Sequence, residues 1–428
     1  MPGRWRSLFR TRGKSQRTLL RSFGYAGALM IVVGGTYLEE CDWPAWRQLM
    51  GPGVRAALAL SRLSPGSELF TYVERDARAD LVETMSQIGV KASTRDRRSP
   101  INFYYKHPLT SPHLEPKAPA HEGQPWNVSG KVVLAFPMFE SQIMVSADRA
   151  IFEIAHNGDS VARDNNIVRG EVESLALIAA EDEIPAPTGD FRDTAAELMA
   201  AHSADLMIVR KRSGGGILFD GEVQHEIPAY VAGEWFKIGA GNVFCTIFAH
   251  YWGEKALDPV QAADLASRAS AVYAGAPAGA LPFSADSLSS EMEQFDPSAP
   301  CKVFVASPCQ SMAQQWLLDQ ALRALWALKV DTVSPYDLGL DGSPRKEGDI
   351  GDQLDDCNAI LVLAEGADIA SVLAVGLARV RSLPMVVLEE EVRASRLALW
   401  QDTGCEIARD LASAVYRSMV AGRRRTGR

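Results

Sequence analysis

Short apolar runs alternate with stretches of helical periodicity along most of this chain. The run MIVVGG at 30–35 precedes a helical pattern at 51–63, and ELFTYV at 68–73 precedes another at 76–89. A longer helical pattern begins at Gly241. Strands that are apolar on both faces are typical of parallel sheets buried between layers of helices. The pattern therefore predicts an α/β fold built on a mostly parallel sheet.

The alternation is interrupted once and then starts again. The stretch 274–300 is rich in Pro, Gly, Ala and Ser, which is typical of a domain boundary, and we place the linker at 286–300. The apolar strands and helices that follow over 301–422 are typical of a smaller flavodoxin-like or Rossmann-like domain. We therefore predict two domains, at 30–285 and 301–422, with basic segments at 1–29 and 423–428 on either side.

The first 38 residues contain seven basic side chains and no acidic one. The basic residues lie within 4–21 and precede SFGYAGALMIVVGGTYL at 22–38, an arrangement with the outline of a signal peptide or a membrane anchor. The apolar run is shorter than the roughly 20 residues of a spanning helix and contains several glycines, so we interpret MIVVGG as a buried first strand. Residues 1–29 are then a disordered extension or translated upstream sequence, with Met30 as the natural start.

Charge and reactive residues exclude several function classes. The 44 basic and 53 acidic residues give a net charge of −9, which argues against a general nucleic-acid binder. The six cysteines lie far apart without CxxC spacing, and the seven histidines form no HExxH arrangement. These patterns predict reduced thiols in a cytoplasmic protein and no structural metal. Neither a nucleic acid nor a membrane is an expected partner.

The segment IGAGNVFCTIFAHYW places a glycine turn directly before a helical pattern. Gly239, Ala240 and Gly241 can present successive backbone N–H groups to an anion, and the positive end of the helix dipole lies at the same place. A glycine turn before a helix is more often purely structural. The segment indicates a phosphate site only together with the sequence around it.

With the VVGG strand, GPGVRAALALSRL and IVRKRSGGGILFDGEVQHEIPAY, this segment resembles the PfkB or ribokinase-like carbohydrate kinase family over residues 30–285. The resemblance implies a three-layer α/β/α sandwich, ATP and Mg²⁺ as cofactors, and phosphoryl transfer to a hydroxyl of a sugar or nucleoside. In that family an aspartate follows GAG and acts as general base, while the GAG amides stabilise the transferring phosphoryl group.

The residue after GAG in this chain is Asn242. An amide cannot accept the hydroxyl proton at neutral pH, and general-base catalysis contributes about 10²–10⁴-fold. Positioning and electrostatics carry much of phosphoryl transfer, so the resemblance predicts a weak kinase and not necessarily an inactive one.

Other family positions can be matched in the same block. The family's sugar-contacting acid corresponds to Glu39, and its second glycine motif corresponds to Gly51 and Gly53. Arg55 could bind an anionic ligand or cap the site as a surface charge. The N-x-x-E segment, which organises magnesium and phosphate in the family, corresponds loosely to IVRGEVESL, which offers Glu171 or Glu173 without the asparagine.

The run INFYYKHPLT at 101–110 alternates like an exposed strand and predicts a flap. Its aromatic residues could cover the acceptor, support a homodimer or only pack.

Residues 301–390 resemble nucleoside 2-deoxyribosyltransferases on VFVASPCQSMAQQW and DQLDDCNAILVLAEGADIASVLAVGLA. The resemblance places Ala374 where that family has its carboxylate nucleophile, and a methyl group cannot attack a sugar carbon. Glu365 and Asp368 could bind ribose hydroxyls or be solvated loop acids. Both blocks thus lack a catalytic carboxylate. The hypotheses are a slow PfkB-type kinase, which we take as the function label, a pseudoenzyme that senses a nucleoside or sugar phosphate, and a scaffold.

Overall fold

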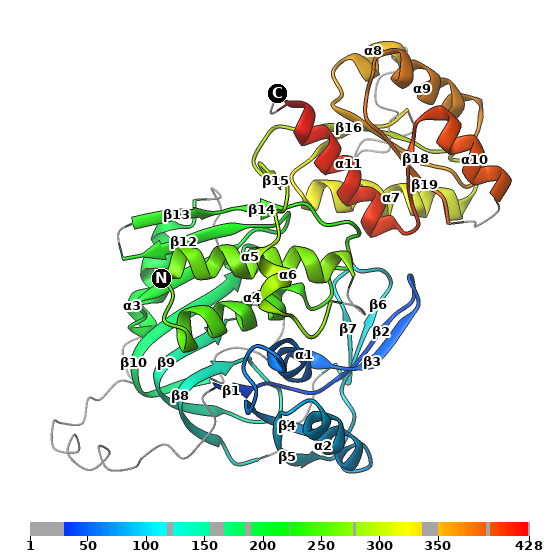
Figure 1. Ribbon diagram of the computed structural model, residues 1–428. Coiled ribbons are helices and arrows are strands. Elements are labelled where there is room, and N and C mark those ends of the chain that lie inside the picture. Colours follow the sequence, from blue (N-terminus) through cyan, green and yellow to red (C-terminus); the bar gives the residue numbers. More distant parts are fainter. Residues whose placement is uncertain are drawn as a thin grey trace, which may run out of the picture.

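A computed structural model describes residues 30–117, 123–154, 167–184, 190–221, 223–276, 280–335, 350–390 and 394–426. The predicted extension at 1–29 lies outside these residues. Two α/β units lie against each other, the larger formed by the first block and the smaller by the second (Figure 1). In the described part of the chain, no helix has the length and apolar character that crossing a membrane requires.

The larger unit is built on a nine-stranded sheet of order β13-β12-β11-β10-β9-β8-β1-β4-β5. Every neighbouring pair from β11 to β5 is parallel, whereas β12 and β13 are antiparallel. This confirms the predicted α/β class with a large, mostly parallel sheet. The strands are β1 (Met30–Val33), β4 (Glu68–Glu74), β5 (Lys91–Arg97), β8 (Trp126–Ala135), β9 (Ile143–Glu153), β10 (Ile167–Ala180), β11 (Leu206–Arg210), β12 (Gly216–Asp220) and β13 (Val223–Ile227).

Helices cover both faces of this sheet because its central strands are apolar on both sides. One core contains residues of α1, α2, α4 and α5, and the other contains residues of α3. The helices are α1 (Gly51–Leu60), α2 (Arg78–Gln87), α3 (Arg192–His202), α4 (Ala240–Phe248), which continues as the π-helix η2 (Ala249–Glu254), α5 (Pro259–Gly275) and α6 (Ala285–Ser289).

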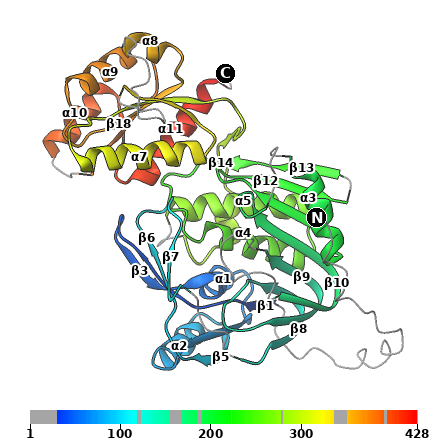
Figure 2. The same cartoon turned by 180° about the vertical axis from the view of Figure 1, so that it is seen from behind.

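A four-stranded flap of order β3-β2-β6-β7 projects from this unit. It consists of β2 (Leu38–Cys41), β3 (Trp46–Leu49), β6 (Asn102–Tyr105) and β7 (His113–Glu115), so the predicted flap strand is β6. Both views place the flap between the main sheet and the smaller unit (Figures 1 and 2). His107, just after β6, lies 3.4 Å from Gln320 of the smaller unit.

The smaller unit has a five-stranded parallel sheet of order β17-β16-β18-β19-β20. Counted within the unit this order is 2-1-3-4-5, which is one of the doubly wound orders. The strands are β16 (Lys302–Ala306), β17 (Asp331–Val333), β18 (Ala359–Leu363), β19 (Met385–Leu388) and β20 (Glu406–Ala408). The helices are α7 (Met312–Ala327), α8 (Ile350–Asp355), α9 (Ile369–Val380), α10 (Ala394–Thr403) and α11 (Leu411–Thr426).

The two units share a packed interface. Trp235 stacks on Tyr416 of α11, with ring centroids 3.8 Å apart and an interplanar angle of 3°. The backbone N–H of Trp235 donates to Ser413 Oγ at 3.0 Å. Within the predicted linker, β15 (Gln294–Phe295) pairs with β14 (Ala229–Tyr230). The segment that leads to the glycine turn is therefore held by the smaller unit.

Candidate functional site

A cavity of about 220 Å³ lies at the carboxyl ends of the main parallel strands, beneath the flap. Ligands of open α/β sheets bind at this edge, because the loops that follow the strands converge there. The flap, α1, the ends of β9 to β11 and the turn before α4 all contribute to its walls. The lining residues are Tyr37, Glu39, Pro52, Arg55, Phe103, Tyr105, Pro137, Glu153, Glu183, Arg210, Gly239, Gly241 and Asn242.

The glycine turn forms as the sequence predicts. Gly239 has φ 82 and precedes α4, and this left-handed conformation is one that glycine adopts without strain. Asn242 lies in the first turn of α4 and reaches the cavity. The structure thus brings the turn, Asn242 and Glu39 together at one place.

Arg55 lies across this turn. Its side chain is 1% exposed, and it donates to both carboxylate oxygens of Glu39 and to the Tyr273 hydroxyl at 3.0 Å. A Cβ atom placed on Gly239 would lie 2.1 Å from Cζ of Arg55, so the guanidinium rests directly on the glycine. Burial alone would lower the pKa of Arg55, but Glu39 and Tyr273 raise it above its ordinary value. The interpretation of Arg55 as a surface charge is wrong.

Asn242 is held by hydrogen bonds on both sides of its amide. Its Oδ1 accepts from Arg55 Nη1 at 3.0 Å, and its Nδ2 donates to Glu153 Oε2 at 3.4 Å. Glu153 also lies 3.4 Å from Arg210, whose guanidinium would clash with a Cβ placed on Gly241. Each glycine of the turn is therefore covered by an arginine, and the Asn242 oxygen faces a cation.

The magnesium and phosphate assignment of Glu171 and Glu173 is wrong. Both side chains are exposed in the first half of β10, whereas the cavity lies beyond the other end of this strand. The acid after β10 that reaches the cavity is Glu183. It lies three residues after Ala180, which is the N-x-x-E spacing with alanine at the first position. Burial and the nearby Glu153 raise the pKa of Glu183.

Sequence reasoning also missed Glu153 and Arg210. Both are the last residues of parallel strands, β9 and β11. Polar residues at the carboxyl ends of predicted strands were the signal that could have found them.

Gly51 and Gly53 serve packing and do not line the cavity. A Cβ on Gly51 would lie 2.5 Å from the carbonyl oxygen of Gly35, and one on Gly53 would lie 2.5 Å from that of Gly34. The two glycines let α1 approach the turn after β1, which carries Arg55 into the site one turn later. Their assignment as substrate-binding residues is therefore replaced by a positioning role.

The matched residues of the smaller unit do not form a comparable site. Ala374 is buried in the core beneath α9, so even a carboxylate there would face apolar neighbours. Asp368 is the N-cap of α9, and its Oδ1 accepts from the Ser371 N–H at 2.9 Å. Glu365 is exposed just before this helix. The N-cap role accounts for an aspartate at position 368, and no ribose ligand is needed to explain it.

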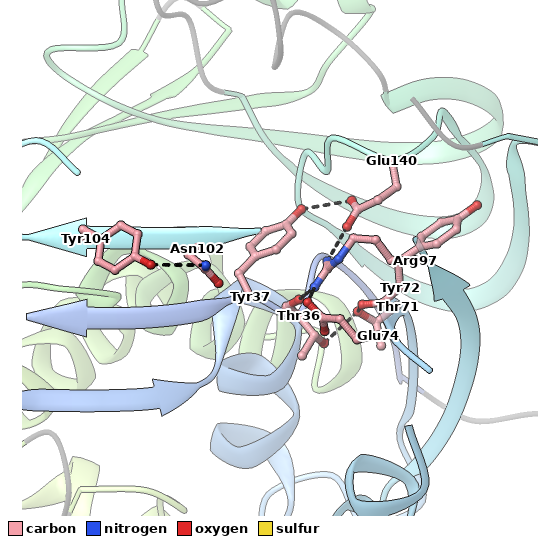
Figure 3. Close-up of polar contacts among 9 residues, drawn as sticks. All are labelled: Thr36, Tyr37, Thr71, Tyr72, Glu74, Arg97, Asn102, Tyr104 and Glu140. Atoms are coloured by element: carbon pink, nitrogen blue, oxygen red, sulfur yellow. Dashed lines mark hydrogen bonds and ion pairs between the residues drawn. The ribbon is translucent and has the colours of Figure 1, made fainter. Parts of the chain in front are cut away.

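A buried polar network fixes the base of the flap (Figure 3). Arg97 of β5 donates to Glu140 at 2.6 Å, to Glu74 at 2.7 Å and to the Thr36 carbonyl at 2.9 Å. The Tyr37 hydroxyl donates to the other oxygen of Glu140 at 3.1 Å. The Tyr37 ring in turn packs against Phe103 of β6, with centroids 5.3 Å apart. These contacts place an aromatic wall on the cavity.

A second cavity, of about 260 Å³, reaches Gly239 from the side of the smaller unit. It is lined by the loop after β6, by Arg212 and Lys237, and by the end of α7. Burial and the neighbouring Arg212 lower the pKa of Lys237 to about 8. Because Gly239 lines both cavities, two ligands could meet at the turn.

The cavity acids do not fit a preformed Mg²⁺ site. Among the described residues no group of three His, Cys, Asp or Glu side chains is arranged to hold a metal ion. Glu39 is paired with Arg55, and Glu153 is shared between Arg210 and Asn242. Magnesium prefers several oxygen ligands that are free to coordinate it.

Gly239→Ala is expected to lower the free energy of unfolding by at least about 1–2 kcal/mol, the cost of the left-handed conformation for an L residue. The added methyl group also falls on Arg55. Urea unfolding of this variant can be compared with Gly233→Ala, where a Cβ would meet no atom within 4 Å. Equal stability of the two variants would contradict the close approach of Arg55 to the turn.

No protein-family model and no curated protein matches this chain. Solved structures that resemble it include a pyrophosphate-dependent kinase in the ribokinase family complexed with a pyrophosphate analog and myo-inositol, at 12% identity and TM-score 0.43, over 60% of this chain and 98% of that one. Ribokinase from Thermotoga maritima is 14% identical at TM-score 0.43, over 61% and 98%. Phosphofructokinase-2 from Escherichia coli in complex with potassium is 11% identical at TM-score 0.43, over 61% and 97%.

Proposed function

We propose that this chain is a ribokinase-like protein that binds a small hydroxyl-bearing ligand, such as a sugar or nucleoside, and has lost efficient phosphoryl transfer. The observation that carries the proposal is the position of Arg55. Its guanidinium covers Gly239 and is held there by Glu39, Tyr273 and Asn242.

The cavity suits a ligand with several hydroxyl groups. Glu39 and Glu153 supply acceptors, and Asn242 supplies both a donor and an acceptor. The flap adds the aromatic side chains of Phe103 and Tyr105. Pockets of this kind combine apolar walls with a few directed polar groups, which fix the orientation of the ligand.

Two features oppose phosphoryl transfer. A transferring phosphoryl group needs donors at the place where its charge develops, and Arg55 occupies the space directly beside the Cα atom of Gly239. Most donors of Arg55 are already engaged, because Glu39, Tyr273, Gly51 and Asn242 accept from it. The amide of Asn242 also cannot take the acceptor's proton. Positioning and acid–base catalysis are thus both impaired.

A second candidate, a slow kinase, is favoured by the position of Glu153. Its carboxylate lies 3.4 Å from Asn242 in the same cavity and could take the proton in place of the missing aspartate. ATP and Mg²⁺ would be the cofactors of this kinase, and the second cavity would admit the phosphoryl donor. The acceptor would be the sugar or nucleoside under the flap.

The test compares ligand binding with turnover in the purified full chain. Sugars and nucleosides are screened by thermal unfolding, and each ligand that stabilises the chain is then offered with ATP and Mg²⁺. We expect stabilisation of roughly 2.7 kcal/mol at a hundredfold excess over the dissociation constant. We also expect no ATP turnover above the rate without protein. Asn127→Asp, an exposed site on β8, is the matched control for Asn242→Asp.

The outcomes separate the hypotheses. Turnover by the natural chain that Glu153→Gln abolishes would establish the slow kinase and reject the binding protein. Turnover only by Asn242→Asp would show an intact phosphoryl site and reject the blocking role of Arg55. A chain that neither binds nor turns over any compound would leave the scaffold hypothesis.

A further inference from the structure

Helix α9 carries an exposed apolar stripe. Ile369, Leu373 and Val380 are 88%, 50% and 82% exposed. Gly376 lies between them, and a Cβ placed there would meet no atom within 4 Å. Both views place α9 on the side of the smaller unit that faces away from the larger one (Figures 1 and 2). Among the described residues, nothing covers this stripe.

The spacing of the stripe is that of a helix that packs on another helix. Residues 369, 373, 376 and 380 follow each other at intervals of four, three and four, which is the seam of a heptad pattern. A solvated helix face normally carries charged residues. The sequence of α9 contains no charged residue before Arg379. The face therefore has the composition of an interface and not of a solvated surface.

We propose that α9 pairs with α9 of a second copy of this chain, antiparallel about a two-fold axis. The axis would pass the midpoint between residues 374 and 375. Leu373 would then lie against the partner's Gly376, and Ile369 against the partner's Val380. Because of the two-fold symmetry, this contact between leucine and glycine would occur twice. In each contact the leucine side chain would fill the space that the glycine, which has no side chain, leaves open. Such an isologous contact is the commonest form of homo-oligomer interface.

Charges at the ends of the helix favour this antiparallel pairing of two copies. Glu365 and Asp368 precede the first turn of α9, and Arg379 lies in its last turn, next to Arg381, which is already paired with Asp355 of the same chain. Antiparallel pairing sets the acidic end of each helix against the basic end of the other, and it also opposes the two helix dipoles. Parallel pairing would set like charges together. The same stripe is thus complementary to itself in both shape and charge.

The contact is short. Twelve residues of helix span about 18 Å, so the interface belongs to the small size class. We therefore expect a reversible dimer whose population rises with concentration. This inference does not depend on the proposed function, because α9 and the cavity lie in different units.

Sedimentation velocity of the full chain over a wide range of concentrations is the test. The natural chain should shift from monomer to dimer, and Leu373→Glu should raise the dissociation constant at least tenfold by placing two buried charges in the seam. Val82→Glu, at an exposed apolar position on α2, is the matched control and should dimerise like the natural chain. Circular dichroism of each variant checks that the fold is kept.

A charge exchange tests the orientation of the helices. Glu365→Arg alone should weaken the dimer, and adding Arg379→Glu should restore it, a recovery that a damaged fold would not give. A chain that stays monomeric at every concentration would overturn the proposal. So would a dimer that survives Leu373→Glu unchanged or a charge exchange without recovery.

Discussion

Arg97→Met is expected to lower the free energy of unfolding by about 3–5 kcal/mol. Arg97 is 4% exposed, and its partner Glu140 is fully buried. The two side chains are joined at 2.6 Å, and Arg97 also bonds Glu74 and the Thr36 carbonyl. Methionine fills part of the space but leaves the Glu140 carboxylate buried without its cation, and such an orphaned charge is more costly than the loss of an exposed pair.

Urea unfolding of Arg97→Met measures this loss, and Arg47→Met is its control. Arg47 pairs with Glu40 at 2.7 Å, but its side chain is 71% exposed, so we expect a change of at most about 1 kcal/mol. Adding Glu140→Gln to Arg97→Met removes the orphaned charge and should recover part of the stability. A loss as small as that of the control would show that the network in Figure 3 does not hold the sheet and the flap together.

Arg55→Met is expected to lower the free energy of unfolding by a similar amount, about 3–5 kcal/mol. Glu39 is buried with Arg55 in the cavity wall and would lose its counter-charge. Glu39→Gln should cost stability as well, because it leaves the buried guanidinium with a neutral partner. The double variant should lose less than the sum of the two single losses, since residues that contact each other couple.

The same variants test the role of Arg55 at the turn. In the double variant Gly239 no longer has a guanidinium packed against it. We therefore expect inorganic phosphate to stabilise the double variant against thermal unfolding more than it stabilises the natural chain. Equal stabilisation by phosphate, or additive losses in urea, would mean that Arg55 and Glu39 do not act as one unit over the turn.

The part of the site that follows from local sequence could be predicted. Gly239 forms a turn before a helix because glycine adopts the left-handed conformation that the turn requires, and Gly241 follows in the first turn of that helix. That the amide of Asn242 cannot act as a general base is a matter of side-chain chemistry and holds in any fold. The alternation of apolar strands and helices predicted the main parallel sheet, because its periodicities arise within a few residues.

The residues around the turn could not be predicted in the same way. Glu153 and Arg210 end two strands and Glu183 follows a third, and the three residues meet only because these strands are parallel neighbours. Glu171 and Glu173 matched a family motif by composition but lie at the wrong end of β10. The position of a residue along β10 decides whether its side chain reaches the cavity. The periodicity of the sequence does not specify which end of the strand meets the cavity.

By itself, then, the sequence determined the α/β class, the glycine turn and a neutral amide at residue 242, because each depends on the conformation or chemistry of neighbouring residues. Only the tertiary structure decided that Arg55 covers Gly239, 184 positions away in the chain, and that Ala374 faces a core. Contacts of this kind depend on how α1, α4 and the sheet dock together. Docking follows from the packing of buried surfaces across the whole unit, which no short stretch of sequence contains.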